Sequence, residues 1–307
     1  MSPNDSLNTT IARRDFMLAG TTLALGLGTA ERVLAQTGPT PAAPKAVNPG
    51  KVSLERRDSI LLIGINRPDA QNRADPPILI GLGKAYYQLE HDDGLRVAVL
   101  HGIGSDFCIG LDVPAFLAGL ASGQLPVKDT DFINPLGLRP PLRSKPVVVA
   151  VQGATRTLGH EYFLAADIRV AASDTLFRQS EVTAGVFPAG GATVRFPREA
   201  GWGNAMRYML TGDEWNAEEA RRMGLVQEVT QPGKQLDRAV ELAKKIAATA
   251  PLGVRATLAS SRQALAADEA TALAALQADF TRILQSDDAK EGRRAFQEKR
   301  APVFRGQ

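Results

Sequence analysis

Short apolar runs alternate with longer segments of helical periodicity through the first two thirds of the chain. Residues 51–57 and 59–66 carry strand-like patterns on either side of the turn pair Arg57-Asp58, which predicts a hairpin. Residues 76–90 then place their apolar side chains three and four positions apart, the spacing of one helical face. The chain therefore opens with a hairpin followed by an amphipathic helix.

The stretch in the middle of the chain combines a buried strand with a helix start. The apolar run from Pro146 to Val151 predicts a short strand covered on both faces, and it stops at Gln152-Gly153. A helix is expected to open near Leu158 and to hold Glu161 in its first turn. Because the unpaired amides of a helix start favour negative charge, this segment is suited to an acid or base beside a developing oxyanion.

The same alternation continues towards the C-terminus, where helices gather. Further strands are expected over residues 95–101, 167–172, 175–178 and 225–230, and helices over residues 192–200, 204–211, 217–223 and within 234–299. Interleaved strands and helices followed by helices alone predict an α/β fold with a helical C-terminal region.

Composition narrows the class of protein. The chain has 307 residues, 44% of them hydrophobic and 22% charged, which excludes a fibrous or intrinsically disordered protein. The net charge of +3 comes without basic clusters interleaved with aromatic residues, so no nucleic-acid partner is expected. A single cysteine, Cys108, excludes an internal disulfide framework.

Residues 1–35 are expected to lie outside the fold. Arg13-Arg14 precede an apolar run too short for a stable membrane anchor, and Val33-Leu-Ala35 ends it as a small-residue cleavage site. This segment resembles a twin-arginine export signal, with Ala12 where that class usually has Ser or Thr. The resemblance implies a periplasmic protein; the alternative is an amphipathic or disordered extension on a cytoplasmic one. Residues 36–50, rich in Pro, Ala and Thr, are interpreted as a linker.

Four motifs follow one another between residues 51 and 304. They are Phe107-Cys-Ile-Gly-Leu-Asp112; Val151-Gln-Gly153 with Gly159-His-Glu161; Gln179-Ser-Glu181 with Gly185-Val-Phe-Pro188 and Gly190-Gly191; and Leu210-Thr-Gly212 with Gly224-Leu-Val226. In this order they resemble the crotonase superfamily of enoyl-CoA hydratases and isomerases. The resemblance implies a crotonase-like spiral of ββα units over residues 51–245 and a helical trimerisation region over 246–307. It also implies a homotrimer or hexamer without a metal or redox cofactor, in which coenzyme A is part of the substrate.

The resemblance also implies roles for individual residues. The backbone amides of Leu111 and Leu158 would polarise the thioester carbonyl, Glu161 would act as base towards water adding at C3, and Glu181 would protonate C2. The chemistry is consistent on its own terms, because two buried carboxyls close together cannot both ionise cheaply and so hold one proton between them. Taken singly, each glutamate is better interpreted as a capping or surface carboxylate, and only the two together favour catalysis.

Basic residues and the C-terminal segment are the candidates for binding coenzyme A, the phosphorylated carrier. Phe296 and Lys299 match positions at which related hydratases contact the adenine and phosphate end of coenzyme A, often from a neighbouring subunit. Together with Arg67 and Arg73, Lys299 would suit a phosphorylated carrier. The alternative is a basic amphipathic last helix that only packs against the fold.

Two departures keep other functions open. Leu158 stands where hydratases commonly have glycine, and His160 adjoins Glu161, where it would be either an auxiliary base or a packed histidine.

The expected substrate and the N-terminal segment also imply different compartments, because coenzyme A thioesters are cytoplasmic whereas the N-terminal segment resembles an export signal. The alternatives are therefore a hydrolase or isomerase of a free carbonyl compound such as a β-diketone, and a non-catalytic member that binds acyl ligands.

Overall fold

The computed structural model describes residues 51–121, 131–266, 282–283 and 285–307. The predicted export signal and linker, residues 1–50, lie outside the described residues. Among the residues that are described, no helix combines the length and apolar character needed to cross a bilayer.

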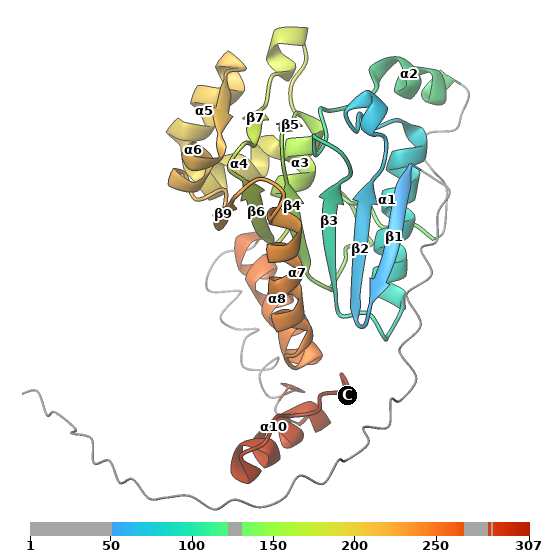
Figure 1. Ribbon diagram of the computed structural model, residues 1–307, viewed down its shortest axis with the longest axis vertical. Helices are drawn as coiled ribbons and strands as arrows, with labels where there is room; N and C mark the ends of the chain where they lie inside the picture. The colour runs from blue at the N-terminus through green and yellow to red at the C-terminus, as the bar shows by residue number, and fades with distance from the viewer. Residues whose placement is uncertain (1–50, 122–130, 267–281, 284) are drawn as a thin grey trace, which may run out of the picture. The chain divides into compact units, whose positions relative to one another are not determined.

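A six-stranded sheet forms the centre of the fold (Figure 1). Its strands, in spatial order, are β1 (Val52–Arg57), β2 (Ile60–Ile65), β3 (Val97–Gly102), β4 (Val147–Val151), β6 (Ile168–Ala172) and β9 (Glu228–Thr230). The predicted hairpin is confirmed, because β1 and β2 pair antiparallel with Arg57 opposite Ile60, and all other pairs are parallel. Strands β2 and β4 are buried at every position, as a sheet covered on both faces requires.

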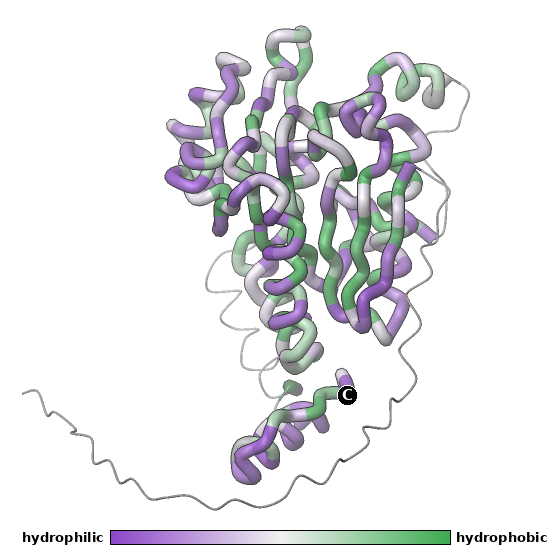
Figure 2. Tube along the Cα trace, in the orientation of Figure 1, coloured by the Kyte–Doolittle hydropathy of each residue, from purple (hydrophilic) through white to green (hydrophobic). Residues whose placement is uncertain are grey.

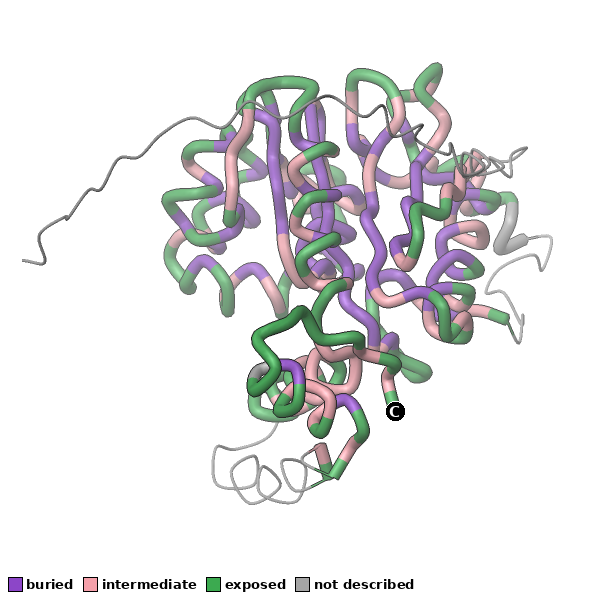
Figure 3. Tube along the Cα trace, turned by 60° about the horizontal axis from the view of Figure 1, so that its bottom comes forward, coloured by how far each residue is buried: buried purple, intermediate pink, exposed green. Residues whose placement is uncertain are grey.

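Two helices cover opposite faces of this sheet, because alternate side chains of a strand point to opposite sides. Leu61 and Ile63 of β2 share one buried cluster with Leu82 of α1 (Pro76–His91). Ile60 of β2 shares a second cluster with Val240 of α7 (Gln235–Ala247). The inner strands are accordingly hydrophobic (Figure 2) and buried (Figure 3) along most of their length.

A second sheet of three short strands was not fully anticipated. It consists of β5 (Ala154–Arg156), β7 (Leu176–Arg178) and β8 (Glu214–Asn216), with β5 parallel and β8 antiparallel to the central β7. Only β7 was predicted, because β5 and β8 show no periodicity of their own. β5 follows β4 after a two-residue break at Gln152-Gly153, and it leads directly into the helix that carries Glu161.

The remaining elements are helical, and of these η1 and η2 were not among the predicted helices. They are η1 (Pro68–Ala70), α2 (Val113–Ala121), α3 (Leu158–Leu164), η2 (Glu181–Ala184), α4 (Ala192–Ala200), α5 (Trp202–Thr211), α6 (Ala217–Arg222), α8 (Pro251–Ala266) and α10 (Asp287–Glu298). Asn216 caps α6 as its side-chain type suggests, its Oδ1 accepting from the Glu219 amide at 2.9 Å. The predicted α/β class with a helical C-terminal region is confirmed.

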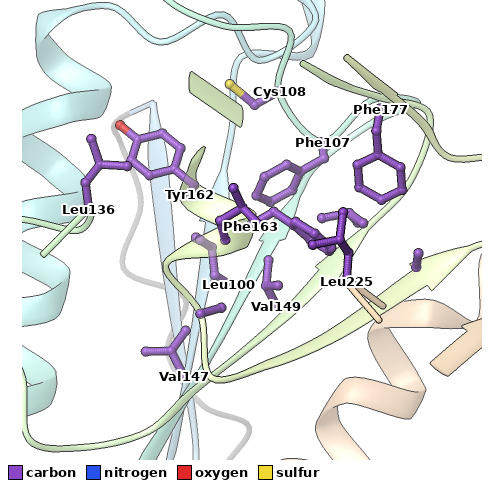
Figure 4. Close-up of a cluster of buried hydrophobic side chains, with 14 of the residues drawn as sticks. Leu100, Phe107, Cys108, Leu136, Val147, Val149, Tyr162, Phe163, Phe177 and Leu225 are labelled. Carbon is purple, nitrogen blue, oxygen red and sulfur yellow. The ribbon is translucent and has the colours of Figure 1, made fainter. Parts of the chain in front are cut away.

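The main core lies between the larger sheet and the helices that follow its strands. Phe107, from the loop after β3, and Phe163 of α3 pack with Val149 of β4 in one buried cluster (Figure 4). Since Phe163 and Glu161 belong to the same short helix, the packing that buries one side of α3 also fixes where Glu161 points.

Candidate active site

Glu161 is buried in the first turn of α3 and is held by the start of another helix. Only 3% of the residue is exposed. Its Oε1 accepts hydrogen bonds from the backbone amides of Gly190, at 2.6 Å, and Ala192, at 3.2 Å, where α4 begins. The sequence predicts that the amides of a helix start stabilise negative charge on Glu161. The helix start that binds Glu161 is that of α4 and not that of its own helix, α3.

The surroundings of Glu161 favour its neutral form. Burial, which penalises the charged carboxylate, and the negative charge of Glu181 together raise its pKa to about 7, against the opposing effect of the two amides. A carboxyl with a pKa near neutrality exchanges protons readily at physiological pH, which is the property required of a general acid or base.

Glu181 opens η2 and presents one free oxygen. Its Oε1 accepts a hydrogen bond from Nε2 of Gln179 at 2.7 Å, whereas its buried Oε2 has no hydrogen-bond partner among the described residues. Burial raises the pKa of Glu181 as well, partly offset by the bond from Gln179. Because the charge of Glu181 acts on Glu161, the two carboxyls form a coupled pair that favours holding one proton.

Two segments run side by side just before α3 begins. The Cys108 amide donates to the Ala154 carbonyl at 3.2 Å, and the Arg156 amide donates to the Cys108 carbonyl at 2.9 Å. Leu111 and Leu158 lie just beyond these bonds. Within the described part of the chain, neither leucine amide donates a hydrogen bond to a protein group.

Glycines allow the close approach of these segments. Gly110 has a φ of 120°, and a Cβ there would collide with Oγ1 of Thr157. A Cβ on Gly159 would collide with the Cys108 carbonyl oxygen. Leu158 itself is accommodated, because its side chain is partly buried against the main core.

The Arg67 side chain forms ion pairs close to Leu111, whose amide is one of the two without a protein acceptor. Its Nη1 contacts Oδ2 of Asp112 at 2.8 Å and Oδ2 of Asp75 at 3.4 Å, and it donates to the Arg73 carbonyl at 3.1 Å. The bond from Arg67 also lowers the pKa of Asp112. Arg67 therefore fixes the residue that follows Leu111, while the Arg73 side chain is exposed.

Within one chain, the C-terminal segment lies away from Arg67 and Arg73. Lys299 is exposed at the end of α10, and the side chain of Phe296 lies outside the described residues. The segment that follows is tied to the start of β3, where Nη2 of Arg96 donates to the Phe304 carbonyl at 2.6 Å. Arg67 and Arg73, by contrast, follow the opposite end of the neighbouring parallel strand β2. One chain therefore does not bring Lys299 together with these two arginines.

His160 is a packed, neutral histidine. It is fully buried, with ring centroids 5.1 Å from Trp215 and 5.2 Å from Phe196. Burial lowers its pKa to about 4, against the opposing effect of a hydrogen bond with Gln179. The structure thus places it in the aromatic core instead of on the surface of a cavity, as the packed interpretation expected.

The sequence assigned no role to the groups that hold the two carboxyls. These are the Gln179 side chain and the amides of Gly190 and Ala192. A signal was present, since Gly190-Gly191 precede a predicted helix whose first amides have no partner within it. No group of three potential metal ligands occurs within the described residues.

Comparison with known proteins identifies the relatives of this chain. A family model described as "Enoyl-CoA hydratase/isomerase" matches residues 55–307. Enoyl-CoA hydratase EchA19 of Mycobacterium tuberculosis is 35% identical over 258 residues, which cover 82% of this chain and 95% of the relative. Crotonyl-CoA hydratase of Syntrophomonas wolfei is 33% identical over 261 residues, covering 82% and 97% respectively. The crystal structure of a probable enoyl-CoA hydratase/isomerase from Mycobacterium abscessus superimposes with a TM-score of 0.81 at 42% identity, covering 84% of this chain and 99% of that one.

Proposed function

The chain belongs to the enoyl-CoA hydratase/isomerase family, and on that premise we propose that it adds water to enoyl-CoA thioesters or removes it from hydroxyacyl-CoA thioesters. The observation that carries the proposal is the pair formed by Glu161, which is buried with its pKa raised to about 7, and Glu181, whose Oε2 is buried without a hydrogen-bond partner among the described residues. The proposed oxyanion donors are the amides of Leu111 and Leu158, and the support for them is that neither donates to a protein acceptor among the described residues.

Each step of the hydration uses one of these groups. Glu161 accepts a proton from a water molecule as the oxygen of that water bonds to C3. The electron pair of the double bond moves towards the thioester oxygen. The amides of Leu111 and Leu158 donate to that oxygen and stabilise the enolate. Glu181, protonated on Oε2, then transfers its proton to C2. The net change is the addition of one water molecule, and the reverse sequence is dehydration.

The carrier is proposed to bind through cations on the surface. Arg73 is exposed beside the segment that leads to Leu111, and its guanidinium would pair with a phosphate of coenzyme A. Lys299 would reach such a phosphate only from a second copy, which supports the expectation of a homotrimer or hexamer. Light scattering of the purified protein tests the assembly, and a monomer at micromolar concentration would contradict it.

We propose that residues 1–35 direct export by a twin-arginine route. The support is Arg13-Arg14 with the apolar run and the small residues that follow, and the match to the family begins only at Glu55. Fractionation of cells that produce the full chain tests this, with Arg13→Lys/Arg14→Lys as the matched variant. Periplasmic wild type with a retained variant is expected, and equal distribution of both would refute export.

One assay panel tests the reaction itself. Purified protein is offered short, long and aromatic enoyl-CoA thioesters, with a free β-diketone beside them. Hydration of at least one thioester, lost in Glu161→Gln, is the expected result. Cleavage of the diketone alone would instead support a hydrolase. Ligand binding without turnover, unchanged in Glu161→Ala, would indicate a non-catalytic member.

A further inference from the structure

Three polar side chains, one from α3, one from the residue after β7 and one from η2, form a row that ends at the active site. Nδ1 of His160, in α3, lies 2.5 Å from Oε1 of Gln179, which comes directly after β7. Nε2 of Gln179 in turn lies 2.7 Å from Oε1 of Glu181. His160 and Gln179 are both fully buried. The row therefore links the aromatic core to the carboxyl without solvent between its members.

The direction of each hydrogen bond follows from the chemistry of the groups. Oε1 of Glu181 carries no hydrogen when the carboxyl is ionised or when it is protonated on Oε2, so it can only accept and the amide nitrogen of Gln179 must face it. The amide oxygen then faces His160, and Nδ1 of the neutral ring must carry the hydrogen to donate to it. Nε2 of His160 carries none, and it has no hydrogen-bond partner among the described residues.

The surroundings of the ring hold it in this arrangement. Four aromatic rings from four elements enclose it, with centroids 5.1–5.9 Å away; they are Phe163, Phe177, Phe196 and Trp215. An apolar enclosure tolerates an unprotonated ring nitrogen better than a buried cation. The enclosure thus keeps the ring neutral and leaves Nδ1 as its polar contact with the row.

We propose that His160 is a positioning residue for the proton transfer at Glu181. Its Nδ1–H holds the Gln179 amide in one orientation, so that the amide NH₂ always occupies Oε1 of Glu181. The transferable proton is then confined to Oε2, the oxygen left without a protein partner. A reversed amide would place its oxygen against Oε1, where it would either repel the carboxylate or draw the proton onto the wrong oxygen. This inference rests on the proposed hydration reaction.

Other charged groups act on the same row and bear on its pH dependence. Glu161 of α3 is coupled to Glu181, and Arg195 of α4 acts on Glu161. Arg169 of β6 acts on His160, whose protonation it disfavours. A change at His160 leaves these charges in place, so a shift in the pH profile of a His160 variant reports on the row.

The first test observes the tautomer and needs no turnover. The chain has three histidines, which allows magic-angle-spinning NMR of protein with ¹⁵N-labelled histidine, assigned with His91→Gln and His101→Gln. His160 is expected to be neutral from pH 5 to pH 8, with its one ring N–H on Nδ1. The Nε2–H form, or an imidazolium within that range, would overturn the proposal even if the protein proves to be a hydratase.

The second test separates positioning from packing. His160→Leu removes the donor, whereas His160→Asn places an amide nitrogen near the position of Nδ1. We expect His160→Leu to lower kcat for crotonyl-CoA hydration by about tenfold to a hundredfold with little change in KM, and to shift the pH profile of kcat. His160→Asn is expected to restore most of the rate. Trp215→Phe keeps an aromatic ring in the enclosure and leaves the hydrogen bonds of the row intact, because Nε1 of Trp215 has no hydrogen-bond partner among the described residues, and it should leave the pH profile unchanged.

A double variant removes the remaining ambiguity. If His160 acts only through Glu181, His160→Leu should cost nothing further in a Glu181→Gln background. An equal loss in both backgrounds, or a wild-type rate in His160→Leu, would refute the positioning role. Absence of wild-type turnover on every thioester would instead refute the proposed function, and the NMR result would still decide the tautomer.

Discussion

Replacing Glu161 by Gln should stabilise the protein at alkaline pH while abolishing its proposed chemistry. Gln keeps an oxygen to accept from the Gly190 and Ala192 amides but cannot ionise. In the wild type, burial raises the pKa of Glu161 from 4.5 to about 7. Between these values the native state therefore binds more protons than the unfolded state, and stability falls as pH rises.

The size of the effect follows from the shift. A rise in pKa from 4.5 to about 7 corresponds to about 3 kcal/mol, present in full above pH 7 and absent below pH 4.5. The free energy of unfolding of Glu161→Gln minus that of the wild type should grow by about this amount between pH 4.5 and pH 8.

Denaturant unfolding at fixed protein concentration measures this difference. Glu218→Gln, which removes an exposed carboxyl from α6, controls for the loss of one negative charge. A difference for Glu161→Gln that stays flat from pH 4.5 to pH 8 would refute the reasoning. It would mean that folding does not raise the pKa of Glu161 and that Glu161 is ionised in the folded protein at neutral pH.

Two further substitutions test the geometry around the carboxyl and the amide, each read by crotonyl-CoA hydration and thermal unfolding. A Cβ on Gly190 would lie 2.6 Å from Cδ of Glu161, so Gly190→Ala should displace the carboxylate and lower kcat by about a hundredfold. Gly203→Ala, with nothing within 4 Å, should leave kcat unchanged, and equal rates for the two variants would contradict the placement. Leu158→Pro removes an amide at the first helical position, where proline is tolerated, and should lower kcat by roughly 10²–10³. Leu158→Ala keeps the amide and should stay close to wild type; a fully active Leu158→Pro would exclude this amide as a donor.

The fold was largely predictable because its strongest signals are local. The hairpin and the apolar run from Pro146 each depend on neighbouring residues, and each is found, although the turn falls on Asp58-Ser59, one residue later than predicted. β5 and β8 were missed because a three-residue strand is decided by its pairing partners, here β7, and not by its own sequence.

The candidate site was predictable in its carboxyls but not in what holds them. Glu161 and Glu181 stood out through motifs, whereas the amides that bind Glu161 lie 29 and 31 residues away in sequence. The surroundings of His160 come from four separate elements, so no local pattern could decide between a base and a packed ring. Long-range packing settles such cases, and it is visible only in three dimensions.

The central claim is that the two carboxyls act as one unit on a single thioester. Single-turnover hydration of crotonyl-CoA by wild type, Glu161→Gln, Glu181→Gln and the double variant measures this directly. If the pair shares the work, each single change should lower the rate by about a thousandfold or more, and the double change should lower it little further. Independent losses that multiply in the double variant, or a wild-type rate in either single variant, would contradict the account.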